Sequence, residues 1–72
     1  MPSRSEIQIL VNGEPNTVSE TQTVADLLES LNLKPRFVAV ERNEELVPRA
    51  VHSECRLKSG DRIEIVTLVG GG

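Results

Sequence analysis

The segment that most restricts the fold is TVADLLESLNLKP, residues 23–35, because it has the pattern of one amphipathic helix. Its apolar residues recur at intervals of three and four and fall on one helix face: Val24, Leu27, Leu28 and Leu31. Thr23 and Asp26 have the spacing of a capping box. Pro35 prevents continuation, so we expect the helix to end near Asn32. An apolar helix face must be buried against another element, which the rest of the chain must supply.

The residues before this helix are patterned as a β-hairpin. Over residues 6–11, Ile7, Ile9 and Val11 alternate with their neighbours, which is the period of a strand. Asn12-Gly13 is the strongest short hairpin signal, because both turn positions favour residues that accept a positive φ. Residues 17–18 belong to the return strand, and Pro15 belongs near its start or at a sheet edge, since it lacks an N–H.

Three more strand-like segments follow the helix. FVAV at residues 37–40 is apolar at every position, which predicts cover on both faces. A turn at residues 42–44 leads to a short strand at residues 45–47. After the unpatterned residues 49–57 and a turn at 59–61, RIEIVTLV forms the last strand, with Ile63, Ile65 and Thr67 on one face. The predicted order is β-β-α-β-β-β, an α+β roll with a single main helix.

Composition excludes several classes of function. Seventy-two residues make one small domain with a thin core. The net charge is −3 and Phe37 is the only aromatic residue, so we expect no nucleic-acid binding and a partner with a basic surface. The apolar run FVAV is too short to cross a membrane, and the N-terminus lacks the apolar stretch of a signal peptide. We therefore expect a cytoplasmic location.

Few side chains in the sequence are candidates for catalysis or for metal binding. His52 and Cys55 are the only histidine and cysteine. They fall short of the four ligands of structural zinc, and we interpret them as a surface or half-buried structural pair. Cys55 cannot form an internal disulfide, which fits a reducing compartment, and it lacks the base and activating environment of a nucleophile. We interpret the paired carboxylates, at residues 44–45 and at Asp61 with Glu64, as solvated. The sequence predicts no enzyme and no metal site.

The chain ends on Gly70, Gly71 and Gly72. Glycine imposes no side-chain bulk, so such a tail can thread a narrow channel and place its last atoms deep inside a partner. Those atoms are the Gly72 carboxylate, which is ionised at neutral pH and can attack the α-phosphate of ATP. Taken alone, three terminal glycines favour a disordered end, and a cloning remnant is a third interpretation.

Four segments together resemble the ThiS family, the sulfur carrier proteins of thiamine thiazole biosynthesis: VNG at 11–13, TVADLL at 23–28, VAVERNEELVPR at 38–49 and GDRIEIVTLVGGG at 60–72. The most diagnostic parts are VPR, GDRIEIV and the terminal diglycine. The resemblance implies a β-grasp fold, the ubiquitin-like roll, with a mixed sheet of four to five strands around one main helix. We expect one domain at residues 6–69 with a flexible tail at 70–72. Residues 1–5 are polar and extend past the usual start of the family, and we expect them to be a disordered extension.

The resemblance further implies a chemical role for the tail. The Gly72 carboxylate would be adenylated with ATP by a partner of the ubiquitin-activating-enzyme type and then converted to a thiocarboxylate. The sulfur would derive from cysteine through a desulfurase or rhodanese-type donor, and thiazole synthase would take it. Gly71 carries over as the second residue of the family's diglycine, and Gly70 adds flexibility. The protein would be a co-substrate of its partners and would hold no cofactor itself.

The residues before the glycines are candidates for docking. Two or three extended residues reach at most about 10 Å, so the folded domain must dock beside each partner's active site. We predict that Leu68, Val69 and the neighbouring sheet face form part of that docking surface. The other interpretation is that both residues complete the last strand. His52 stands where relatives often carry a tryptophan or another aromatic residue, and its imidazole can still cover apolar surface.

Several alternatives stay open. The small subunit of molybdopterin synthase and a carrier for tRNA thiolation share the same chemistry. A ubiquitin-like modifier would be joined through Gly72 to lysines of target proteins, and a plain binding module would have no use for the tail. The VNG start, the VPR segment and the IEIVTLVGGG ending favour the thiazole branch.

Overall fold

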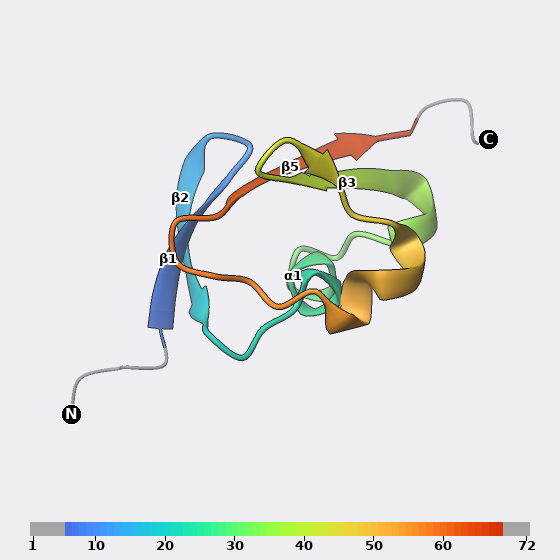
Figure 1. Ribbon diagram of the computed structural model, residues 1–72. Helices are drawn as coiled ribbons and strands as arrows, with labels where there is room; N and C mark the ends of the chain where they lie inside the picture. The colour runs from blue at the N-terminus through green and yellow to red at the C-terminus, as the bar shows by residue number, and fades with distance from the viewer. Residues whose placement is uncertain (1–5, 69–72) are drawn as a thin grey trace.

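The computed structural model describes residues 6–68 and shows a mixed sheet that curves around one α-helix (Figure 1). The strands are β1 (Glu6–Val11), β2 (Glu14–Ser19), β3 (Val38–Arg42), β4 (Glu45–Leu46) and β5 (Arg62–Thr67). The helices are α1 (Val24–Ser30) and two 3₁₀ helices, η1 (Pro35–Phe37) and η2 (Arg49–Glu54). Over these residues the predicted order and the α+β class are confirmed. No helix in residues 6–68 is long and apolar enough to cross a membrane.

The last strand of the chain lies in the middle of the sheet. The strand order is β2-β1-β5-β3-β4, with β5 parallel to β1 and antiparallel to β3. The parallel ladder is short and joins Leu10 to Arg62 and Val11 to Ile63. The antiparallel ladder extends from Arg42 opposite Ile63 to Val38 opposite Thr67. The end of β5 is therefore held mainly by β3.

Two tight turns match their sequence signals. Asn12 and Gly13 adopt φ values of 51° and 85°, so the predicted hairpin turn between β1 and β2 is confirmed. Pro15 is the second residue of β2, which is an edge strand, as predicted. Asn43 and Glu44 also have positive φ, at 52° and 72°, and join β3 to β4. These turns fix the register of the two hairpins.

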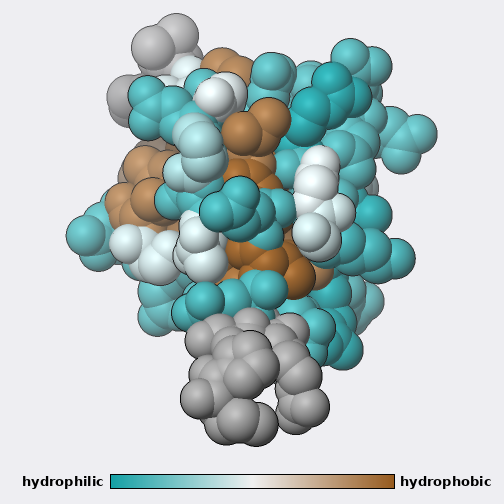
Figure 2. Space-filling model, turned by 90° about the vertical axis from the view of Figure 1, so that its left-hand side faces the viewer, coloured by the Kyte–Doolittle hydropathy of each residue, from teal (hydrophilic) through white to brown (hydrophobic). Residues whose placement is uncertain are grey.

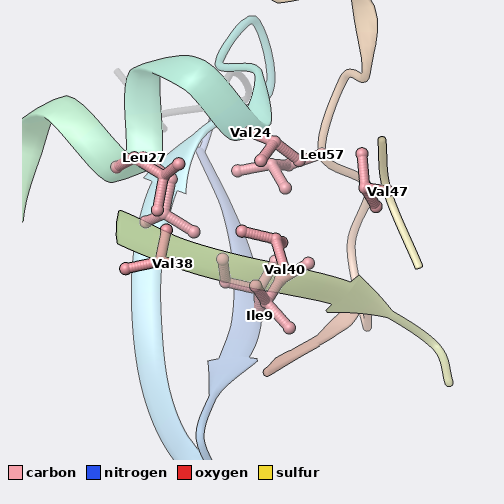
Figure 3. Packing of buried hydrophobic residues seen from close by; sticks show 9 residues of the cluster. Ile9, Val24, Leu27, Val38, Val40, Val47 and Leu57 are labelled. Atoms are coloured by element: carbon pink, nitrogen blue, oxygen red, sulfur yellow. The ribbon is translucent and has the colours of Figure 1, made fainter. Parts of the chain in front are cut away.

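The helix begins as predicted. The Thr23 hydroxyl accepts a hydrogen bond from the Asp26 backbone N–H at 3.2 Å, and the Asp26 carboxylate accepts one from the Thr23 N–H at 3.0 Å. Figure 3 shows side chains of α1 pointing toward β1 and β3, with Leu57 and Val47 beside them. The core consists of Ile9, Val24, Leu27, Leu28, Val38, Val40, Val47, Leu57 and Ile63.

The prediction that Leu31 belongs to the buried helix face is wrong. The helix ends at Ser30, Leu31 is its C-cap, and its side chain is 40% exposed. The chain then reverses at Asn32, which has a positive φ of 60°. This reversal brings Leu33 against the core, where it is half-buried. The apolar pattern continued for longer than the helix itself.

The prediction of cover on both faces of residues 37–40 is also wrong. Val38 and Val40 are buried, but Phe37 belongs to η1 and is 42% exposed. Ala39 points to the other side of β3 and is half-buried. In the part of the chain that the structure describes, α1 covers one face of the sheet and leaves the other open (Figure 1). We call these the inner and outer faces.

Asp61 is buried, which contradicts its interpretation as a solvated carboxylate. It is 5% exposed and accepts hydrogen bonds from the Lys58 backbone N–H at 2.8 Å and from Asn43 Nδ2 at 3.1 Å. The Arg42 guanidinium lies 3.5 Å away. Asp61 therefore ties the turn before β5 to the turn after β3. The other carboxylates of this group, Glu64 and residues 44–45, are exposed as predicted.

We expect Asp61→Asn to lower the free energy of unfolding by about 2 kcal/mol, because the amide NH2 would replace one accepting oxygen and place a donor against a donor in a buried site. Urea unfolding of the purified protein measures this change. Glu29→Gln, at an exposed carboxylate on α1, is the matched control and should leave the stability unchanged. Equal stability of the two variants would contradict a structural role for Asp61.

Candidate functional site

The glycines predicted to carry the chemistry lie outside the described residues, as do Val69 and the predicted extension at residues 1–5. What the structure describes is the place where the tail begins. Leu68 is the last described residue, and its N–H donates a hydrogen bond to the Phe37 carbonyl at 2.8 Å. The Leu68 backbone thus continues the β5–β3 pairing by one residue, while its side chain is 48% exposed.

A side chain supports β5 on its other edge. The β1 ladder ends at Val11, but the Asn12 Oδ1 accepts a hydrogen bond from the Ile65 N–H at 2.8 Å. The Asn12 Nδ2 donates to the Ile65 carbonyl at 3.4 Å. At this position the Asn12 side chain therefore makes the backbone hydrogen bonds that a neighbouring strand would otherwise make. Sequence reasoning assigned Asn12 only to the turn, because a contact 53 residues away leaves no local signal.

Apolar side chains surround the end of β5 on the outer face. Leu46 is 65% exposed and Val66 is 56% exposed. Val66 lies directly opposite Ala39 in the β5–β3 register. Ala39, Leu46 and Leu68 line one shallow hollow of about 150 Å³. We call Ala39, Leu46, Val66 and Leu68 the tail-end patch. It is an open apolar surface beside the start of the tail, and sequence reasoning named only Leu68 of its members.

A second hollow lies on the side formed by β1 and β2. Apolar side chains are visible there between hydrophilic ones (Figure 2), and Ile7 and Leu57 line a space of about 400 Å³. Leu10 of β1 pairs with Arg62 of β5 in the parallel ladder. Ile7 lies three residues before Leu10, and Thr67 lies five residues after Arg62. The hollow and the end of β5 are therefore about eight residues apart along the strands, which is about 27 Å at about 3.4 Å a residue. The tail-end patch is therefore the better placed of the two surfaces to accompany the tail.

His52 and Cys55 have structural surroundings. His52 lies in η2, is buried rather than at the surface, and donates from Nε2 to the Val47 carbonyl at 3.1 Å. It thus covers the core, as its imidazole was expected to do. The half-buried Cys55 Sγ accepts a hydrogen bond from Arg42 Nη1 at 3.2 Å. Among residues 6–68, no group of three or more histidine, cysteine, aspartate or glutamate side chains is arranged to hold a metal ion.

Comparison with known proteins places the chain in a family. Residues 6–72, which include the three terminal glycines, match the sequence model of the ThiS family. The chain belongs to the ThiS family. The sulfur carrier protein ThiS of Bacillus subtilis is 45% identical over 53 residues, covering 74% of this chain and 80% of that protein.

Solved structures agree with the expected fold. The crystal structure of the thiamine biosynthesis protein ThiS from Geobacter metallireducens superimposes with a TM-score of 0.79 at 35% identity. The match covers 92% of this chain and all of that one. The expected β-grasp fold, with a mixed sheet and one main helix, is therefore confirmed for this ThiS-family protein.

Some relatives are much longer. A thiazole synthase of Paramagnetospirillum magneticum is 41% identical over 66 residues, which is 92% of this chain and 20% of that protein. A thiazole synthase of Magnetococcus marinus is 39% identical over the same length, again 20% of that protein. This chain thus spans about a fifth of these two relatives, so a ThiS-like segment occurs within proteins named thiazole synthase.

We expect Asn12→Gly to weaken the attachment of β5 by about 1 kcal/mol, because both side-chain hydrogen bonds to Ile65 are lost while glycine keeps the positive φ of the turn. Hydrogen exchange at the Ile65 amide should become faster. Asn16→Gly is the control, since the Asn16 side chain bonds only locally to the Glu14 carbonyl. Unchanged Ile65 exchange in Asn12→Gly would contradict the bridging role.

Proposed function

We propose that this protein is the sulfur carrier of a thiamine pathway and that Gly72 bears the sulfur. The observation that carries the proposal is the family match over residues 6–72, which extends through the terminal glycines. In the proposed reaction, the Gly72 carboxylate attacks the α-phosphate of ATP on a ubiquitin-activating-enzyme-like adenylyltransferase, and pyrophosphate leaves. The outer sulfur of the donor's cysteine persulfide then displaces AMP to form an acyl disulfide. A second thiol cleaves the S–S bond, which releases the thiocarboxylate and leaves a disulfide on the donor, and the thiocarboxylate passes its sulfur to thiazole synthase. The carrier is therefore a co-substrate of its partner enzymes. We propose the cytoplasm as its location.

The hydrogen bonds of the described domain support the role of a carrier. Asp61, His52 and Cys55 each have partners within the fold, so the folded part of the chain positions the tail and leaves chemistry to its partners. Residues 69–72 reach at most about 14 Å beyond Leu68. A partner must therefore hold the carrier close to its active site, and the tail-end patch is the surface that we assign to that contact, together with Val69.

One observation favours the thiamine branch over molybdopterin synthesis, tRNA thiolation and protein modification. Two relatives whose names specify thiazole synthase contain a segment similar to 92% of this chain. A carrier segment and a thiazole synthase in one polypeptide share a high effective concentration, which favours direct transfer between them. We infer that this chain delivers its sulfur to a thiazole synthase.

Intact-mass measurement tests the proposed reaction. Incubation with the adenylyltransferase of the encoding organism, ATP and a sulfur donor should add the mass difference between sulfur and oxygen. Cys55→Ser should retain the gain, and removal of Gly71 and Gly72 should abolish it. A gain that depends on Cys55, or no gain in the wild-type protein, would overturn the proposal. A series of larger conjugates would indicate a protein modifier.

The docking role of the tail-end patch has its own test. We expect Leu68→Ala to raise the KM of the carrier for adenylation about fivefold, because an apolar contact beside the tail is lost. Leu31→Ala, at a leucine of similar exposure at the C-cap of α1, is the control and should leave KM unchanged. Circular dichroism verifies that both variants fold. Equal KM values for the two folded variants would rule out the docking role of Leu68.

A further inference from the structure

The hollow beside the end of β5 is lined by two arginines as well as by apolar residues of the tail-end patch. Arg36 of η1 and Arg49, the first residue of η2, line the same space of about 150 Å³ as Leu68. Both arginines are exposed, and neither forms an ion pair within residues 6–68. The described residues that line this space include no aspartate or glutamate. We call it the basic hollow, and its charge favours a negatively charged occupant.

Arg36 is held beside the point where the tail starts. Its guanidinium lies 5.0 Å from the centre of the Phe37 ring, which is a cation–π contact. The Phe37 carbonyl accepts the hydrogen bond from the Leu68 N–H at 2.8 Å. The positive charge and the last described residue of the chain are therefore both attached to Phe37. A charge that is positioned in this way loses less freedom when it binds an anion.

His52 adds an unpaired acceptor to the basic hollow. Its side chain lines the hollow and is 4% exposed. Because Nε2 donates to the Val47 carbonyl, Nδ1 is an acceptor, and it has no hydrogen-bond partner within residues 6–68. A buried acceptor without a donor costs free energy. A backbone N–H that enters the hollow supplies the missing donor.

The chain's own tail has the chemistry that the basic hollow lacks. Residues 69–72 follow Leu68, reach at most about 14 Å and end in three glycines, so they bring backbone N–H groups without side-chain bulk. Under the proposed function they also bring the Gly72 carboxylate. A second hollow at the end of β5, lined by Thr67, has Glu14 as its only charged lining residue within residues 6–68 and repels a carboxylate.

We propose that in the free carrier the glycine tail folds back into the basic hollow, where its terminal carboxylate pairs with Arg36 and Arg49. The inference rests on the proposed function, in which the chain ends at a free Gly72 carboxylate. Because the tail is tethered at Leu68, its effective concentration at the hollow is in the millimolar range, and we expect the contact to be formed about half of the time. The folded-back tail covers Leu68, so docking at the tail-end patch and this contact exclude each other.

The test is NMR spectroscopy of the free protein, with no enzyme present, at low salt. At neutral pH the heteronuclear NOE of the Gly71 amide should be higher in the wild type than in Arg36→Gln/Arg49→Gln, because the contact orders the tail. With a ¹³C label in the Gly72 carboxyl, its pKa should lie about 0.3 pH units lower in the wild type than in that variant, because the arginines favour the ionised form. Both differences should shrink as sodium chloride is added.

Lys58→Gln/Arg62→Gln is the matched control, because it removes two exposed cations near the start of β5 and changes the net charge equally. It should leave the NOE of Gly71 and the pKa of the Gly72 carboxyl at their wild-type values. Equal values in the wild type and in Arg36→Gln/Arg49→Gln would overturn the proposal. Values that change with protein concentration would overturn it too, because the tail would then bind another copy of the chain.

A single variant and an enzymatic assay complete the test. If the double variant fails to fold, Arg49→Gln keeps the contact between Arg36 and Phe37 and should change the NOE and the pKa in the same direction. In adenylation, the folded double variant should show a KM about twofold lower than that of the wild type, because its tail is always available. A higher KM would contradict the competition. Failure of the wild-type chain to be adenylated would contradict the proposed function and leave the NMR results unaffected.

Discussion

Val24, Leu27 and Leu28 of α1 are almost completely removed from water, because the sheet curves around the one α-helix of the described chain. Each such burial contributes about 2 kcal/mol, a large share of the stability of so small a domain. The same contact buries Ile63 of β5, so the strand that leads to the tail is fixed in the middle of the sheet. The position at which the tail starts therefore depends on the packing of α1.

Most side chains that could have carried chemistry instead hold this arrangement together. Asp61 joins two turns, Asn12 replaces a strand neighbour of β5, and His52 fixes η2 to the Val47 carbonyl. The outer face of the sheet is different, since Leu46, Val66 and Leu68 are exposed there next to the start of the tail. The inner face maintains the fold, and the proposed function assigns contact with partners to the outer face.

Local patterns predicted the parts of the fold that depend on near neighbours. The hairpin turn at Asn12-Gly13 and the capping box at Thr23 follow from residues within one turn of each other. The central position of β5 could not be predicted, because parallel pairing with β1 joins residues that are some fifty positions apart. The burial of Asp61 depends on a side chain 18 residues away, and its sequence neighbours do not reveal it. The glycine tail could be recognised, but the outer-face residues beside it required the register of the strands.

The Gly72 carboxylate is the group on which the proposed activity depends, and growth of the encoding organism reports on it directly. In a strain whose only copy of this chain lacks Gly71 and Gly72, thiazole formation should stop. We expect that strain to grow only when thiamine or its thiazole precursor is supplied, and the full-length chain to restore growth without either. Growth of the truncated strain in medium without thiamine would contradict the assignment of the tail as the sulfur-bearing part of the protein.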